Sequence, residues 1–86
     1  MKMFTAEIYE IVCKYVKKKE VAIDENLFEI GIDSMNLLFM VNDIETLFSI
    51  TIPDDELLIS NFETIRQICC LVKKIKEGKK YDTEQR

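Results

Sequence analysis

The 86-residue sequence contains no histidine, only two glycines and a single proline. Without an imidazole, the chain can form neither a Ser–His nor a Cys–His nucleophilic pair, and it lacks the usual general base at neutral pH. It also contains no glycine-rich phosphate-binding loop. Because helix breakers are scarce and Leu, Ile, Met, Glu and Lys are abundant, the composition indicates a helical protein. We expect that it catalyses nothing by itself.

Long apolar runs are also missing, since no stretch of the sequence approaches the ~20 residues of a membrane span. The first residues show no apolar segment followed by a cleavage site, so we expect no signal peptide and a cytoplasmic location. The three cysteines, Cys13, Cys69 and Cys70, are odd in number and exclude a closed disulfide framework. With no histidine beside them, we expect no metal site, and we interpret all three as reduced residues in the core or at its boundary.

Positive charge is not in excess, because 12 basic residues stand against 16 acidic ones and the net charge is −4. Binding to nucleic acid needs a basic stripe that neutralises phosphates. Lysines do cluster at residues 17–19 and 73–80, but each cluster lies near the end of a predicted helix, where cations offset the helix dipole. We therefore favour solvated helix ends over an RNA-binding patch. We predict a monomer with no nucleic-acid or membrane partner.

Apolar residues recur at helical spacing in three segments: residues 4–16, residues 34–48, and a segment that follows Asn61 and ends at Gly78 as a C′ residue. Residues 53–60 predict a short helix whose first turn holds the acidic side chains of residues 54–56, which we interpret as capping groups. The core positions expected from the three long segments are Phe4, Ile8, Ile11, Val12, Tyr15, Leu37, Met40, Val41, Ile44, Leu47, Phe48, Ile65, Ile68, Cys69, Val72 and Ile75. The predicted fold class is all-α, a small four-helix bundle of three longer helices and a short third one. The predicted domain is residues 1–78, followed by a flexible tail at 79–86.

The connection over residues 20–33 shows no helical period, but it holds several apolar residues that we expect to pack onto the core. They are Val21, Ile23, Leu27, Phe28 and Ile30. Gly31 offers a position with positive φ just before the second long helix. A long ordered loop in so small a domain is usually functional.

Ser34 places a hydroxyl at the start of a helix, where free backbone N–H groups and the helix dipole favour attached negative charge by about 0.3–1 kcal/mol. From physical chemistry alone, an ordinary N-cap or first-turn serine is the simpler interpretation. Asp33 weakens it, because Asp33 is itself a natural N-cap and no Glu or Gln stands at position 37 to complete a capping box from Ser34. Regulatory phosphorylation of Ser34 is a further alternative.

A second apolar patch follows Ser34 on the side of the helix away from the core stripe. It consists of Met35, Leu38 and Phe39, and Asn42 joins it further along. An apolar patch rimmed by polar groups marks a binding surface. A wider core contact with the 20–33 connection is an equally good interpretation. A helical module that binds a partner helix through this patch is another function open to such a chain.

The run NLFEIGIDSM, residues 26–35, resembles the phosphopantetheine attachment motif of acyl and peptidyl carrier proteins, which is centred on Leu-Gly-x-Asp-Ser-Leu. Gly31, Asp33 and Ser34 match this motif, and Ile30 and Met35 replace its leucines conservatively. Similarity continues in the segments Ile52-Pro53-Asp54 and Phe62-x-Thr64-Ile65, so that the resemblance covers about residues 4–76.

This resemblance implies the four-helix bundle of acyl carrier proteins, with a 4′-phosphopantetheine arm that a phosphopantetheinyl transferase attaches to Ser34 from coenzyme A. Asp33 would position that modification. The free-standing chain would then hold acyl or aminoacyl groups as thioesters. Its second long helix would dock onto an adenylating or acyl-loading enzyme, and later onto a downstream synthase or transferase. The candidate partner contacts are Met35, Leu38, Phe39, Asn42 and Asp43.

The sequence departs from bacterial fatty-acid carriers, which resemble one another in a strongly acidic second helix. Here that helix contains only Asp43 and Glu45 as acidic residues, so electrostatic steering toward a basic partner should be weak. This departure favours a peptidyl or aminoacyl carrier of a specialised-metabolite pathway. A carrier for fatty acid or polyketide synthesis remains the alternative.

Overall fold

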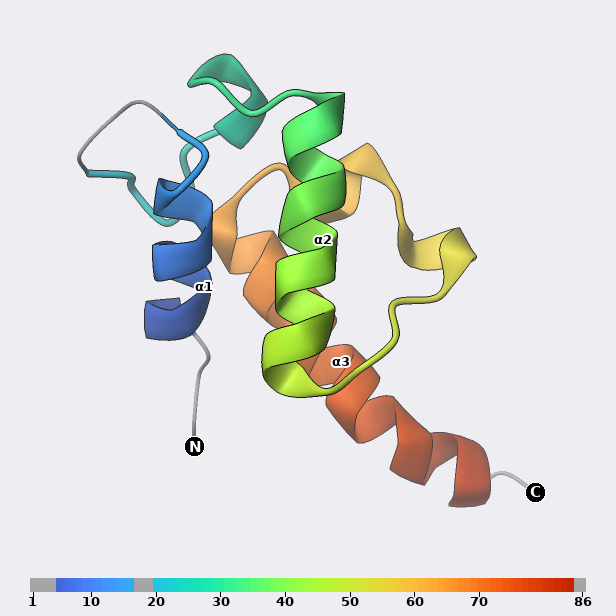
Figure 1. Cartoon of the computed structure of the whole chain (residues 1–86). Coiled ribbons are helices and arrows are strands. Elements are labelled where there is room, and N and C mark those ends of the chain that lie inside the picture. The colour runs from blue at the N-terminus through green and yellow to red at the C-terminus, as the bar shows by residue number, and fades with distance from the viewer. Residues whose placement is uncertain (1–4, 17–19, 85–86) are drawn as a thin grey trace.

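A computed structural model describes residues 5–16 and 20–84, the residues 78–84 by their backbone alone. Within these ranges the chain forms three α-helices: α1 (Thr5–Cys13), α2 (Ser34–Phe48) and α3 (Ile65–Glu84) (Figure 1). Three short 3₁₀ helices, Leu27–Glu29, Asp54–Glu56 and Ile59–Phe62, interrupt the connections, and the described residues contain no strand. The predicted all-α fold class is therefore confirmed.

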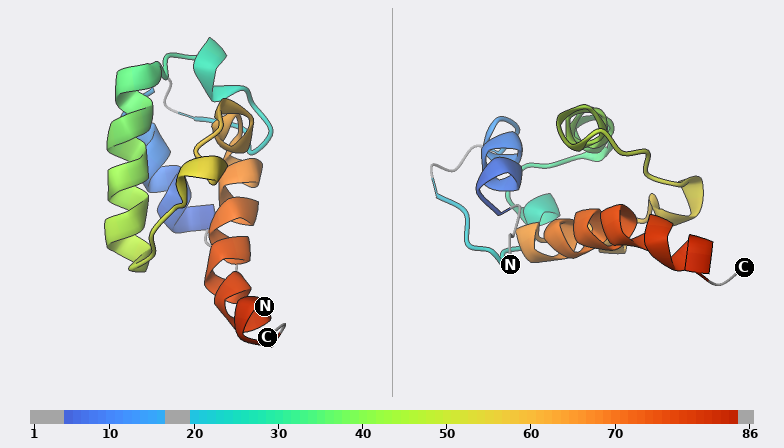
Figure 2. Two further views of the ribbon diagram at one scale, coloured as in Figure 1. Left: turned by 90° about the vertical axis from the view of Figure 1, so that its right-hand side faces the viewer. Right: turned by 90° about the horizontal axis from the view of Figure 1, so that it is seen from below.

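The helices surround one core. α1 packs against both α2 and α3, and in the view from below α1 and α2 are seen nearly end-on while α3 runs across beneath them (Figure 2). The segment 49–62 lies on the side of α2 opposite to α1, as both figures show. α2 is thus flanked on its two sides by different parts of the chain, and its remaining face is turned outward.

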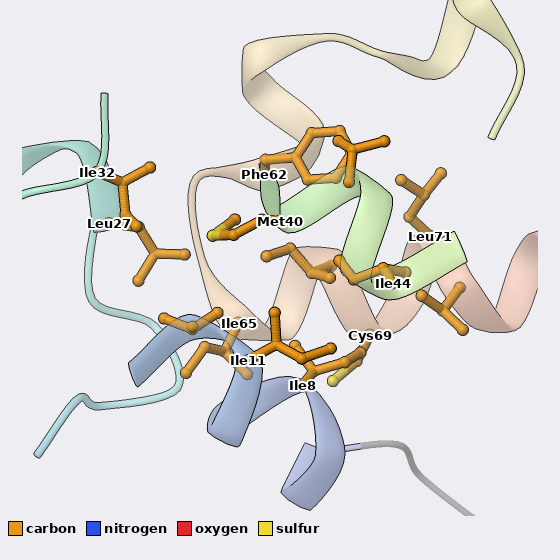
Figure 3. Packing of buried hydrophobic residues seen from close by; sticks show 14 of the residues in the cluster. Ile8, Ile11, Leu27, Ile32, Met40, Ile44, Phe62, Ile65, Cys69 and Leu71 are labelled. Atoms are coloured by element: carbon orange, nitrogen blue, oxygen red, sulfur yellow. The ribbon is translucent and has the colours of Figure 1, made fainter. Parts of the chain in front are cut away.

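All three α-helices and the 3₁₀ helices Leu27–Glu29 and Ile59–Phe62 contribute side chains to this core (Figure 3). The fully buried ones are Ile8, Val12, Leu27, Met40, Ile44, Phe62, Ile65, Ile68 and Val72. Among the described residues, the predicted stripes are confirmed except at Leu47, which is 52% exposed, and Phe4 is not tested. Leu47 lies at the edge of the α2 stripe, where Glu7 and Glu10 of α1 and Lys14 of the following turn line a shallow groove with it. Because those long polar side chains cannot bury it, Leu47 stays outside the core.

The 20–33 connection packs onto the core as predicted, with Val21 and Leu27 buried. Two backbone bonds attach it to the residues around the start of α3: Leu27 N donates to Glu63 O at 2.7 Å, and Arg66 N donates to Ile23 O at 3.0 Å. The Arg66 guanidinium also binds both carboxylate oxygens of Asp24, at 2.7 and 3.1 Å. This connection therefore holds the start of α2 in a defined place.

The short helix predicted over residues 53–60 is wrong as a single helix. The chain instead forms two 3₁₀ turns, Asp54–Glu56 and Ile59–Phe62. Its three consecutive apolar residues 57–59 are all exposed, so the segment has no one-sided apolar face, and packing of such a face is what stabilises short helices. Polar contacts hold it instead, because Asn61 Nδ2 donates to Glu56 O at 2.8 Å and Lys74 Nζ lies 2.8 Å from Glu56 Oε2.

The predicted end of the last helix at Gly78 is also wrong, because α3 continues to Glu84. A glycine inside a helix costs about 1 kcal/mol relative to alanine, which the surrounding good helix formers can offset. The division into a domain at 1–78 and a flexible tail at 79–86 stays a prediction. Phe4, the lysines at 17–19 and residues 85–86 lie outside the described residues.

The cysteines are free in the structure, and their burial differs. Cys69 is buried and Cys13 is half-buried, but Cys70 is exposed, so its assignment to the core boundary was wrong. Successive residues on a helix point about 100° apart, and Cys70 lies on the side of α3 away from the buried residues Ile65, Ile68 and Val72. Within the described ranges, no group of three or more Cys, Asp or Glu side chains could hold a metal ion. The same ranges include no helix with the length and apolar character needed to cross a membrane.

Candidate functional site

The start of α2 is fixed by a turn and a cap. Gly31 adopts φ 127°, a region that favours glycine, which confirms the positive-φ position expected there. Asp33 is the N-cap, and its Oδ1 accepts a hydrogen bond from Asn36 N at 2.9 Å. The backbone N–H of Asp33 donates in turn to Asn36 Oδ1 at 3.3 Å, which completes a capping box. A search for Glu or Gln three residues after Ser34 does not find this box, because the pair begins one residue earlier, at Asp33, and its second member is an asparagine.

Ser34 is the first residue of α2 and is exposed. Because Asp33 caps the helix, the Ser34 hydroxyl has no capping role, and no described residue forms a hydrogen bond with it. The backbone N–H groups of Ser34 and Met35 precede the first intrahelical bond, which runs from Leu37 N to Asp33 O at 2.9 Å. A phosphate group joined to this hydroxyl would meet free N–H donors and the positive end of the helix dipole. The site therefore fits a phosphodiester.

The apolar patch beside Ser34 faces solvent. Met35 is 59% exposed, Leu38 63% and Phe39 51%. These values exclude the alternative in which the patch widens the core contact with the 20–33 connection. Leu38 follows Ser34 by four residues, one turn along the helix, so the apolar surface begins directly beside the serine hydroxyl. Asn42 is also exposed and continues this outward face.

Asp43 lies at the edge of α2 that faces α1, and its carboxylate is engaged within the chain. Tyr15 donates its hydroxyl to Asp43 Oδ2 at 2.6 Å, and Lys14 Nζ lies 3.0 Å from the same oxygen. The Tyr15 hydrogen bond, with the Lys14 ammonium beside it, holds the pKa of the Asp43 carboxyl below its ordinary value. The other acidic residue of α2, Glu45, accepts a hydrogen bond from Ile52 N at 2.8 Å. Both carboxylates of α2 are therefore engaged in hydrogen bonds within the chain.

We expect Asp43→Asn to flatten the dependence of stability on acid pH. The folded pKa of Asp43 lies below its ordinary value of 3.8, so the carboxylate stabilises the fold above that value. This contribution is lost as the pH falls through the folded pKa. Urea midpoints measured between about pH 5 and about pH 3 should fall more steeply for the wild type than for the variant. Asp54→Asn is the control, because no described residue binds the Asp54 carboxylate; parallel profiles for wild type and Asp43→Asn would contradict the prediction.

The comparisons with known proteins point to one family. Residues 6–72 match the family model described as "Phosphopantetheine attachment site". Over 50 residues the chain is 46% identical to an acyl carrier protein homolog of Mycoplasmopsis pulmonis (strain UAB CTIP), a match that covers 57% of this chain and 66% of the relative. The chain thus spans just under two thirds of that relative's length.

The fold is similar to that of a carrier protein of known structure. The match is to a chain in the crystal structure of an engineered Bradyrhizobium japonicum glycine:[carrier protein] ligase complexed with a carrier protein from Agrobacterium tumefaciens and ATP. The TM-score is 0.78 at 29% identity, and the alignment covers 84% of this chain and 99% of the other.

The region matched by the family model includes α2 with its capping box and the exposed Ser34, together with the 20–33 connection and most of the core. A match of this length depends on residues throughout the helical domain and not on the attachment motif alone. This chain belongs to the acyl and peptidyl carrier protein family, whose attachment domain carries a covalently bound 4′-phosphopantetheine.

Proposed function

We propose that Ser34 is the attachment residue of the 4′-phosphopantetheine arm and that the chain carries acyl or aminoacyl groups on it as thioesters. The observation that supports this most directly is the Ser34 hydroxyl, which is exposed at the N-terminus of α2 and has no partner in the described part of the chain. The thiol that ends the arm supplies the thioester chemistry. The residues of the chain supply a fixed attachment point and the surfaces to which enzymes bind.

Asp33 is the residue that we propose to position the modification. Its Oδ1 is held by Asn36 N, which fixes the carboxylate directly beside Ser34. Because a phosphopantetheinyl transferase must bring coenzyme A to the serine hydroxyl, a rigid residue next to Ser34 reduces the number of orientations in which the two can meet. Asp33 therefore acts through the geometry of the helix start.

The chemistry of α2 favours an aminoacyl or peptidyl cargo in a specialised-metabolite pathway. Both α2 carboxylates are engaged within the chain, whereas Met35, Leu38 and Phe39 are exposed. Docking must then rely on apolar contact more than on attraction to a basic partner. The similar carrier chain was crystallised with a glycine:[carrier protein] ligase and ATP, which supports an adenylating enzyme as the loading partner here. A phosphopantetheinyl transferase and a downstream synthase or transferase complete the expected set of partners.

A charging experiment tests the cargo class. The chain is first converted with coenzyme A by a promiscuous phosphopantetheinyl transferase and is then offered either amino acids, ATP and an adenylating ligase, or malonyl-coenzyme A and a malonyl transferase. We expect intact mass spectrometry to show an aminoacyl adduct in the first reaction. An adduct in the malonyl reaction alone would favour the fatty-acid or polyketide alternative, and failure of the initial conversion would contradict the carrier role at Ser34.

A further inference from the structure

We propose that Tyr15 is a positioning residue, which holds the ring of Phe39 as the aromatic anchor of the docking surface on α2. In this arrangement Asp43 acts through Tyr15 and does not itself contact the partner enzyme. The inference rests on the proposed function, because it concerns the enzymes that act at Ser34.

Phe39 is exposed, yet its ring is not free to move in all directions. Its centroid lies 6.4 Å from that of Tyr15, and the two rings are stacked at an interplanar angle of 23°. One face of Phe39 is therefore supported within the chain while about half of the side chain remains open to solvent. Aromatic side chains are enriched among the residues that dominate binding energy, and an anchor that is already oriented loses less entropy on binding.

Tyr15 is itself held by hydrogen bonds at its hydroxyl and at its backbone. Its hydroxyl donates to Asp43 Oδ2 at 2.6 Å, and its backbone nitrogen donates to Val12 O at 2.9 Å, in the turn that follows α1. The Lys14 ammonium lies 5.7 Å from the centroid of the Tyr15 ring, within reach of a cation–π interaction. Phe39 and Asp43 are four residues apart on α2, so the Tyr15 side chain spans two successive turns of that helix. The hydrogen bond from the Tyr15 hydroxyl to Asp43 thereby fixes the orientation of the Tyr15 ring, which supports Phe39.

The same contacts indicate the chemistry of the enzyme surface that would bind α2. Oδ2 of Asp43 is shared by the Tyr15 hydroxyl and the Lys14 ammonium group, so a basic partner would compete with Lys14 for this carboxylate. Because Lys14 offsets the charge of Asp43, this acid of α2 is not left as an unpaired charge beside the patch formed by Met35, Leu38 and Phe39. The complementary enzyme surface is therefore an apolar socket for an aromatic ring, and not a cluster of arginine and lysine.

Steady-state kinetics of a phosphopantetheinyl transferase test this proposal, with coenzyme A fixed and the unmodified chain as the varied substrate. Phe39→Ala should raise KM about tenfold and leave kcat unchanged, as expected for loss of a binding contact away from the reacting atoms. Tyr15→Leu, which removes the supporting ring, should raise KM about fivefold, and Tyr15→Phe, which removes only the hydroxyl, about twofold. The double variant Tyr15→Leu/Phe39→Ala should be no worse than Phe39→Ala alone, because both changes remove the same anchor.

Tyr9→Phe is the matched control, since Tyr9, in α1, is also a half-buried tyrosine, and its hydroxyl accepts a hydrogen bond from Val21 N at 3.4 Å. Its KM should equal that of the wild type. If Tyr15→Leu does not fold, as judged by circular dichroism, Tyr15→Phe and Asp43→Asn still test the proposal, because both substitutions preserve the shape of the side chain. The double variant Tyr15→Phe/Asp43→Asn should then have the same KM as Tyr15→Phe alone.

Three results would overturn the inference: an unchanged KM for Tyr15→Leu, a double variant whose loss is the product of the two single losses, or a full additional loss from Asp43→Asn in the Tyr15→Phe background. A wild-type chain that the transferase does not modify at all would overturn the proposed function instead. The two failures are thus distinguishable in one set of assays.

Discussion

Ser34→Ala is expected to gain no mass when it is incubated with coenzyme A and a promiscuous phosphopantetheinyl transferase, whereas the wild-type chain gains one phosphopantetheine group. The loss should be complete, because a methyl group offers no oxygen with which to form the phosphodiester. The fold should survive, since Asp33 and not Ser34 caps α2 and replacing an exposed first-turn serine removes no hydrogen bond within the described chain. Intact mass spectrometry measures the gain, and urea denaturation verifies the fold.

Two other serines provide matched controls. Ser49 is the C-cap of α2 and Ser60 lies in the 3₁₀ helix Ile59–Phe62, and both are exposed. Neither stands at the N-terminus of a long helix, so Ser49→Ala and Ser60→Ala should be modified as fully as the wild type. A mass gain that persists in Ser34→Ala would place the arm on a different residue and refute the assignment.

Phe62→Ala is expected to destabilise the fold by about 3–5 kcal/mol, the usual cost of removing a buried phenylalanine ring from a core. Phe62 is fully buried, and its side chain is the largest of those that are fully buried in the described residues. A domain of this size has a total stability toward the lower end of about 5–15 kcal/mol, so this loss would unfold a large part of the population. Urea denaturation followed by far-UV circular dichroism measures the change.

Phe39→Ala removes the same atoms from the outward face of α2 and is the natural comparison. Phe39 is 51% exposed and its ring partner is Tyr15, so the expected loss is at most about 1.5 kcal/mol. The two variants therefore separate the core from the docking surface: one should lower stability, and the other should raise the KM of the transferase. Equal urea midpoints for Phe62→Ala and Phe39→Ala would contradict this division.

α2 could be predicted from the sequence with its observed bounds, Ser34–Phe48. Both ends carry local signals, with Asp33 as a cap at the start and a β-branched run before Pro53 after the end. Local signals of the same kind gave wrong predictions for residues 53–60 and for the end of α3. Pro53 and three acidic residues have the composition of a first helical turn, yet the exposed residues that follow offer no face to pack, and two 3₁₀ turns form instead. Gly78 could have ended α3, but the helix continues through it.

The sequence by itself determined the family, the all-α fold and the candidate attachment residue, because a motif and a helical period are properties of residues near one another in the chain. It left open whether Ser34 caps its helix and whether Met35, Leu38 and Phe39 face the core or solvent. The structure answered the first through a local bond, from Asn36 N to Asp33. Tertiary packing decided the second, since exposure depends on which surfaces the other helices cover. The bond between Tyr15 and Asp43, 28 residues apart, arises only because α1 packs against α2. No local pattern encodes that contact, and it is the contact that supports the exposed ring of Phe39.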